Sequence, residues 1–110
     1  PHEVVDEEFR QCPTISTKLH EAGERGALPH SYYSHTILRN NPGPVIPLAL
    51  YMDGVGYSQV DTVIGLWIVN MISMKRHVFG LIRKSRLCAC GCRGWCTFAP
   101  LLKYVDWSFA

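Results

Sequence analysis

The chain has no long hydrophobic run and neither of the common glycine-rich phosphate loops. Its most apolar stretch, residues 63–72, is ten residues long, whereas a helix that crosses a membrane needs about twenty. The N-terminus is acidic and lacks the apolar segment of a secretory signal. No serine has an acid–base partner at a recognisable spacing. Export, a membrane partner, nucleotide binding and serine hydrolysis therefore have no support.

Acidic residues are scarce in the second half of the chain. Residues 1–61 carry a net charge of −4, and residues 62–110 carry a net charge of +6. Six basic residues lie within nineteen positions that contain no acid: Lys75, Arg76, Arg83, Lys84, Arg86 and Arg93. Such a surface attracts polyanions, and nucleic acid is the first candidate partner. The alternative is a face that is only solvated or that pairs with the acidic segment 3–8.

Four of the five cysteines, in contrast, are crowded into nine residues: Cys88, Cys90, Cys92 and Cys96. Soft thiolates at this density, with Gly91 and Gly94 to let the backbone fold round an ion, predict a structural Zn²⁺ site. The spacing is tighter than that of two separated C-x₂-C pairs, so one ion need not use all four. Cys12 or a histidine, such as His77, would then complete the ligand set. An unmetallated turn and redox or disulfide chemistry are the alternatives, whereas a catalytic zinc would need an open position.

The odd number of cysteines, without an export signal, favours reduced thiols. We therefore expect an intracellular protein, nuclear or cytoplasmic. A length of 110 residues suits one domain. The chain begins at Pro1 and ends in an aromatic run, so we expect a fragment whose end is covered by the rest of a parent polypeptide or by a protein partner.

The hydrophobic pattern predicts an α+β fold in two parts. Residues 1–44 read as a helical or irregular lead-in of short helices, which ends at the breaker Asn41-Pro-Gly-Pro44. Residues 45–110 read as a three-stranded antiparallel sheet, followed by the cysteine-rich zinc knuckle and a closing helix. The expected strands are 45–52, 63–72 and 77–83, and the expected helix is 100–109. The last two strands should form a hairpin.

Asp53 stands where the first strand is expected to end, in the pair Asp53-Gly54. An acid at the exit of an apolar strand, feeding two antiparallel strands, is the arrangement of ribonuclease-H-like nucleases, in which carboxylates bind two Mg²⁺ ions. Asp53 is therefore a candidate catalytic residue. The alternative is an ordinary Asp-Gly turn. Asp61 and Asp106 are candidate companions, although their spacing does not predict that they converge.

Several segments together carry a resemblance to a known family: 47–57, 65–70, 75–77, 83–85 and 88–97. They resemble uncharacterised open reading frames that are abundant in algal genomes, notably those of dinoflagellates. The first-strand Asp and the nearby cysteines also loosely resemble cysteine-bearing DDE transposases of the Plavaka and KDZ type. That likeness implies an incomplete ribonuclease-H-like core with Asp53 as the first acid of the set. The later acids are not visible, so we expect Mg²⁺ and activity only in an intact parent protein.

The tryptophans Trp67, Trp95 and Trp107 are expected to pack in the core and against its ends. Trp95, beside Arg93 and the cysteines, could instead stack on a base. Two functions fit the sequence. One is a zinc-stabilised nucleic-acid-binding segment of a mobile-element protein, inactive alone. The other is a structural or protein-interaction module with a zinc knuckle and no nucleic-acid role.

Overall fold

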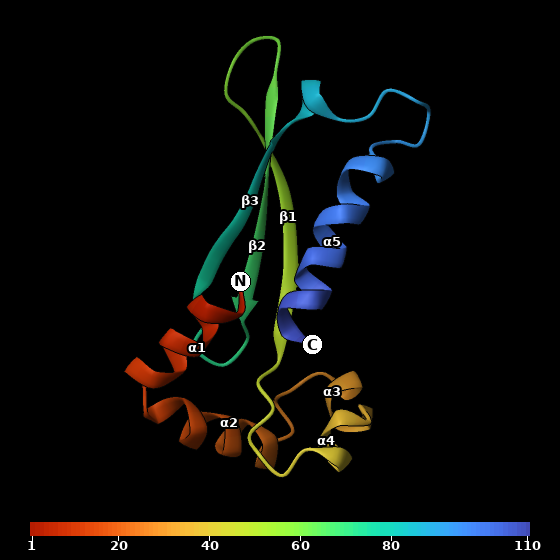
Figure 1. Cartoon of the computed structure of the whole chain (residues 1–110). Helices are drawn as coiled ribbons and strands as arrows, with labels where there is room; N and C mark the ends of the chain where they lie inside the picture. Colours follow the sequence, from red (N-terminus) through yellow and green to blue (C-terminus); the bar gives the residue numbers. More distant parts are fainter.

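The computed structural model describes residues 1–110 and shows the expected α+β fold, a long three-stranded sheet flanked by helices (Figure 1). The helices are α1 (His2–Gln11), α2 (Thr14–Glu24), α3 (His30–Ser34), α4 (Ile37–Asn40), the 3-10 helix η1 (Lys84–Arg86) and α5 (Trp95–Phe109). The strands are β1 (Leu48–Gly56), β2 (Thr62–Asn70) and β3 (Arg76–Arg83). None of the helices combines the length and the apolar character that a membrane crossing requires.

The sheet has the order β1-β2-β3 and both pairings are antiparallel, which confirms the predicted hairpin. A tight turn joins β2 to β3. In that turn Asn70 Oδ1 accepts the N–H groups of Ile72 and Ser73, at 2.9 and 3.3 Å, and Met74 adopts a positive φ of 61°. The pairing shifts between Leu66 and Trp67, which increases the local twist of the sheet.

The expected end of the first strand was wrong. Asp53 and Gly54 do not form a turn, because β1 runs through them and pairs them with Gly65 and Ile64 of β2. The nine-residue pairing of β1 with β2 outweighs the local turn preference of Asp-Gly. Asp53 is therefore a mid-strand residue on the outer strand β1.

A small core joins the two ends of the chain to the middle strand. Val5 of α1, Ile68 of β2 and Val105 of α5 are buried together, with Leu48 and Phe79 packed against them. The backbone N–H of His2 donates to Ser108 Oγ at 3.1 Å, so the two termini lie close together (Figure 1). Both α1 and α5 therefore cover the face of the sheet that Ile68 presents, and the lead-in takes part in the core.

The closing helix begins earlier than expected. It starts at Trp95, and Pro100 lies inside it. The sequence placed Pro100 in the first turn, where a proline is normally favoured. The additional turn forms because the cysteine loop ends at Gly94, whose left-handed φ of 87° turns the chain into the helix.

The tryptophans do not all pack as expected. Trp67 is half-buried and its ring lies over Gly65, where an added Cβ would come within 2.0 Å of the ring. Trp95 and Trp107, in contrast, are 61% and 70% exposed. Core packing was therefore a wrong expectation for these two.

Candidate metal centre

The four clustered cysteines converge in the loop between η1 and α5. The sulfurs of Cys88, Cys90, Cys92 and Cys96 all lie within 4.8 Å of one another. The two sulfurs of Cys90 and Cys96 are 3.7 Å apart. Metal–sulfur bonds of about 2.3 Å place the sulfurs of a tetrahedral site about 3.8 Å apart. The four side chains can therefore hold one metal ion, and the tight spacing does not prevent one ion from using all of them.

The backbone of the loop explains how so short a segment gathers four thiols. Gly91 and Gly94 adopt φ angles of 90° and 87°, and Arg93 between them adopts 54°. These left-handed residues turn the chain back on itself, and glycine adopts such angles at little cost. The backbone N–H of Cys88 donates to Thr97 Oγ1 at 3.0 Å and ties the first cysteine to the first turn of α5.

Cys92 also accepts a hydrogen bond from the start of α5. The backbone N–H of Cys96, which has no partner within the helix, donates to Cys92 Sγ at 3.4 Å. This bond, with further ones from the neighbouring thiols, lowers the pKa of Cys92 to about 6. The hydrogen bonds to Cys92 and Cys90 raise the pKa of Cys96 to about 12. A thiolate thus forms readily at Cys92, whereas Cys96 needs a nearby positive ion to lose its proton.

The alternative ligands do not join this cluster. Cys12 lies at the end of α1, where its sulfur contacts Thr14 Oγ1 at 3.3 Å. His77 lies at the start of β3 and contacts Glu8. Among the other histidines, His2, His20 and His35 contact Ser108, Glu24 and the N–H of Ile37. The four cysteines form the one group of three or more metal-binding side chains in the structure.

The six basic residues are divided between the two ends of β3. All six are exposed and none forms an ion pair, so the alternative in which they pair with segment 3–8 does not occur. Lys75 and Arg76 lie at the beginning of β3, about 23 Å along the strand from Arg83. Four lie towards the metal centre: Arg83, Lys84, Arg86 and Arg93. Arg83 lies over the ring of Tyr57, 5.3 Å from its centroid.

Trp95 stands beside these charges as the first residue of α5. Its neighbours in the chain are Gly94 and Cys96, so the metal loop fixes its backbone. Gly94 is buried against Leu87 and Phe98, and an added Cβ there would meet Phe98 at 3.1 Å. The exposed indole therefore projects from a firmly packed point of the chain.

Asp53 lies apart from the metal centre and from any group of carboxylates. Its Oδ2 accepts the hydroxyl of Tyr51 at 3.1 Å, and its Oδ1 accepts the N–H of Gly54 at 2.8 Å. Asp61, one candidate companion, is bound instead by Ser85, whose Oγ donates to it at 2.6 Å. Asp106, the other, lies on α5. The catalytic role of Asp53 stays a prediction for a larger protein.

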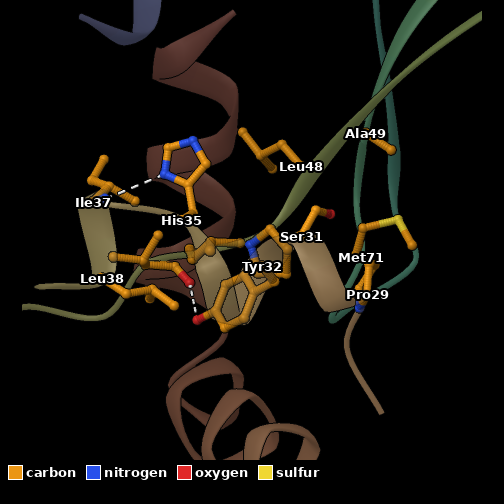
Figure 2. A pocket seen from close by; sticks show the side chains of 12 residues that line it. Pro29, Ser31, Tyr32, His35, Ile37, Leu38, Leu48, Ala49 and Met71 are labelled. Atoms are coloured by element: carbon orange, nitrogen blue, oxygen red, sulfur yellow. Dashed lines mark hydrogen bonds between the residues drawn. The ribbon is translucent and has the colours of Figure 1, made fainter. Parts of the chain in front are cut away.

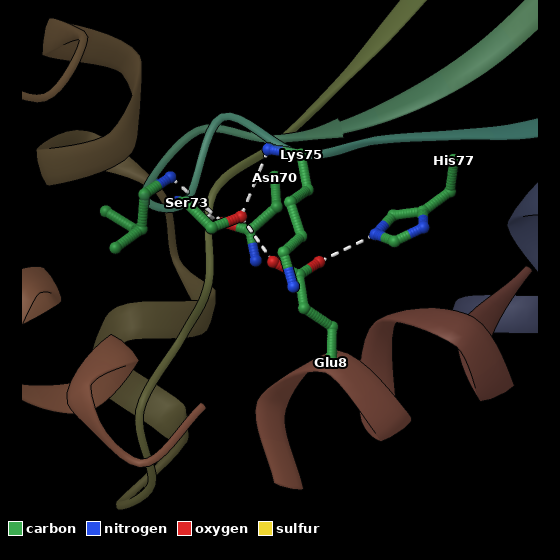
Figure 3. Close-up of polar contacts among 6 residues, drawn as sticks. Glu8, Asn70, Ser73, Lys75 and His77 are labelled. Atoms are coloured by element: carbon green, nitrogen blue, oxygen red, sulfur yellow. Dashed lines mark hydrogen bonds and ion pairs between the residues drawn. The ribbon is translucent and has the colours of Figure 1, made fainter. Parts of the chain in front are cut away.

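The polar cluster around Glu8 was missed by the sequence analysis (Figure 3). Glu8 is 4% exposed; its Oε2 lies 2.7 Å from His77 Nε2, and its Oε1 accepts the hydroxyl of Ser73. Burial raises the pKa of Glu8, but hydrogen bonds from Ser73 and His77 and the charge of His77 outweigh it, so the pKa lies below its ordinary value. The only signal in the sequence that Glu8 is buried is its position three residues after Val5, which places both side chains on one face of α1. The cluster fastens α1 to the β2–β3 turn.

A cavity of about 360 Å³ lies at the end of the sheet opposite the metal centre, between α3, α4 and the start of β1 (Figure 2). Its walls are mainly apolar, and they include Ile37, Leu38 and Met71. The hydroxyl of Tyr32 donates to the carbonyl of Val45 at 2.8 Å, and His35 Nδ1 accepts the N–H of Ile37. These groups are used within the chain, so the cavity is a packing gap that joins the lead-in to β1.

Comparison with models of protein families, with curated proteins and with solved structures found no match.

Proposed function

We propose that this chain is a zinc-stabilised nucleic-acid-binding segment of a mobile-element protein, inactive on its own. The observation that carries the proposal is the juxtaposition in one short segment of a four-thiolate cluster, basic side chains without acidic partners, and an exposed tryptophan. The segment runs from Arg83 to Cys96. The one acid that hydrogen-bonds to this segment is Asp61, which accepts the backbone N–H and the hydroxyl of Ser85.

Zinc is the ion that best suits four thiolates with no other ligand. It is bound tetrahedrally by cysteine in structural sites, and a complete set of four leaves no position for a reacting water. The ion would therefore fix the loop and the first turn of α5, and the proposed role is structural. Lys84, Arg86 and Arg93 would be held around it.

The basic side chains provide the contact with phosphate. Lys84, Arg86 and Arg93 are exposed and lie in η1 and in the metal loop. A phosphate contact releases counterions, so binding should weaken with salt and depend little on sequence. Trp95 adds a flat aromatic surface on which an unpaired base can stack. The pairing of stacking with charge favours single strands over duplexes.

Fluorescence anisotropy with a labelled single strand tests the proposal, using the zinc-loaded chain at several salt concentrations. Replacement of Lys84, Arg86 and Arg93 by alanine should weaken binding and lower the slope of log K against log salt by about 2, since each single-strand contact contributes about 0.7. The matched control replaces Lys18, Arg25 and Arg39, three exposed cations elsewhere. Equal effects of the two triple variants, or no effect, would contradict the proposal.

The resemblance to DDE transposases supplies the proposed parent. It assigns Asp53 as the first acid of a Mg²⁺ site that only the intact protein would complete. The support is limited to the position of Asp53 on the first strand of an antiparallel sheet. In the intact protein, Asp53→Asn should abolish strand cleavage, and full activity would remove Asp53 from catalysis.

A second candidate is a protein-interaction module in which the metal loop only supports the sheet. One observation favours it: the face of the sheet that α1 and α5 do not cover carries exposed apolar side chains. Single-strand binding distinguishes the two, because this module would bind no nucleic acid at moderate salt.

A further inference from the structure

One face of the sheet has no helix packed on it except at the end near α3 and α4, and we call the uncovered part the open face. In antiparallel strands, residues directly opposite each other present their side chains on the same side. Ile68 is in the core with α1 and α5, so Trp67 and the residues in register with it point the other way. The open face thus has three rows across β1, β2 and β3: Tyr51-Trp67-Val78, Asp53-Gly65-Leu81 and Val55-Val63-Arg83. The next row, Ala49-Val69-Arg76, lies beside α3 and α4, where Ala49 lines the cavity and Val69 is buried.

The middle of the open face is apolar. Tyr51, Val55, Val78 and Leu81 are all exposed, Leu81 at 68%. The rings of Tyr51 and Trp67 are in contact, with centroids 5.6 Å apart. At about 3.3 Å per residue and 4.8 Å between strands, these rows form a continuous patch rather than scattered side chains. A patch of this kind usually marks a surface that another molecule covers.

The charges on the open face are arranged asymmetrically. Asp53 lies on the outer strand β1, and Arg83 lies on the opposite outer strand β3. Neither forms an ion pair within the chain. An acidic edge and a basic edge on either side of an apolar centre make this face complementary to a copy of itself that is turned by half a rotation.

We propose that the open face forms a symmetric dimer with a second copy of the chain. A two-fold axis parallel to β2 places β1 of one copy over β3 of the other. Asp53 then lies over Leu81 of the second copy, one row from its Arg83, and the symmetry repeats this contact. The two Trp67 side chains meet near the axis. Two sheets pack face to face in this manner with their strands nearly aligned.

The size of the face sets the strength of the dimer. Three rows over three strands span about 20 Å by 15 Å, so the two copies together cover on the order of 600 Å². That lies below the roughly 1,200–2,000 Å² of stable, specific interfaces and in the range of weak, transient contacts. The dimer is therefore weak, with a dissociation constant in the micromolar range or above, and it forms and separates readily.

Sedimentation equilibrium of the zinc-loaded chain, from micromolar to submillimolar concentration, tests the proposal. The expected result is a monomer–dimer equilibrium. Leu81→Asp should weaken it at least about tenfold, because it brings a second carboxylate against Asp53 of the other copy at both contacts. The matched control is Val60→Asp, which places the same charge at a side chain that is 94% exposed in the β1–β2 loop. A monomer at every concentration, or a dimer that Leu81→Asp leaves intact, would overturn the proposal.

A charge exchange separates this arrangement from every other dimer. Asp53→Arg and Arg83→Asp should each weaken self-association at least about tenfold, because each brings like charges together at both contacts. A mixture of the two variants should recover the dimer, since the arginine introduced in one copy then meets the aspartate introduced in the other. Failure of the mixture to associate would overturn the geometry. Circular dichroism of each variant establishes that a loss of association is not a loss of fold, and nucleic acid is absent from all samples.

Discussion

The sulfur of Cys90 lies 3.7 Å from the sulfur of Cys96, although the first belongs to an irregular loop and the second to the first turn of α5. That distance suits two ligands of one tetrahedral ion. Two elements with different backbone conformations are thus brought together at a single point, and a metal would hold them there.

Removal of the metal should disrupt the start of α5. Native mass spectrometry of the reduced chain should show one zinc, and a chelator should release it together with part of the helical circular dichroism signal, because the ion gathers thiolates that otherwise repel one another. Absence of bound zinc, or a spectrum that chelation leaves unchanged, would show that the loop is an unmetallated turn.

Loss of one cluster cysteine should weaken zinc binding strongly. We expect Cys96→Ser to lower the affinity by more than the roughly 10–100-fold that loss of an outer-shell partner costs. Cys12→Ser is the control, because Cys12 lies at the end of α1 and outside the cluster. Competition with a chromophoric chelator measures both affinities. If the two variants bound zinc equally well, Cys96 would not be a ligand.

Glu8 should make folding sensitive to acid. Its pKa in the fold lies below the ordinary 4.5, so the unfolded chain takes up the proton first as the pH falls. The stability that Glu8 contributes is therefore complete above about pH 4.5 and is lost as the pH falls through the pKa of the folded state.

Urea unfolding at several pH values measures this effect. Glu8→Ala should lower the free energy of unfolding at pH 7 by about 3 kcal/mol, because it leaves His77 and Ser73 without a buried partner. The same variant should show a weaker loss of stability below pH 4.5. Glu7→Ala, on the exposed side of α1, is the control. Equal acid sensitivity of Glu8→Ala and the unaltered chain would contradict the assignment.

Trp95 should contribute to single-strand binding by stacking. Trp95→Ala should cost about 1–3 kcal/mol of binding free energy, the usual contribution of one stacked base. Trp107→Ala removes an equally exposed indole at the far end of α5 and should have little effect. Anisotropy titrations compare the two. Identical affinities would remove Trp95 from the nucleic-acid contact.

The sheet was predictable because its signals are local and agree with its pairing. Residues 63–70 are rich in β-branched side chains, and the short polar connection before His77 leaves room only for a hairpin. The cysteine cluster was predictable for the same reason, since all four ligands lie within nine residues.

Other features depend on partners that are distant in the sequence. The pair Asp53-Gly54 alone favours a turn, and only its pairing with Gly65 and Ile64 makes it part of a strand. Glu8 reads as a solvated acid, and only the packing of α1 against the β2–β3 turn buries it beside His77, 69 positions later. The exposure of Trp95 follows from the direction in which α5 leaves the cysteine loop, which no periodicity encodes.

That direction gives the cysteine loop influence over a part of the molecule that it does not touch. Val105, which enters the core with Val5 and Ile68, lies nine residues beyond Cys96 on the same helix, or about 14 Å along its axis. A rotation of about 10° at the cysteines would move Val105 by about 2 Å, which is enough to open a close-packed contact. Because α5 is one continuous helix, a metal ion bound by the four cysteines at its start would also fix the position of Val105 in the core.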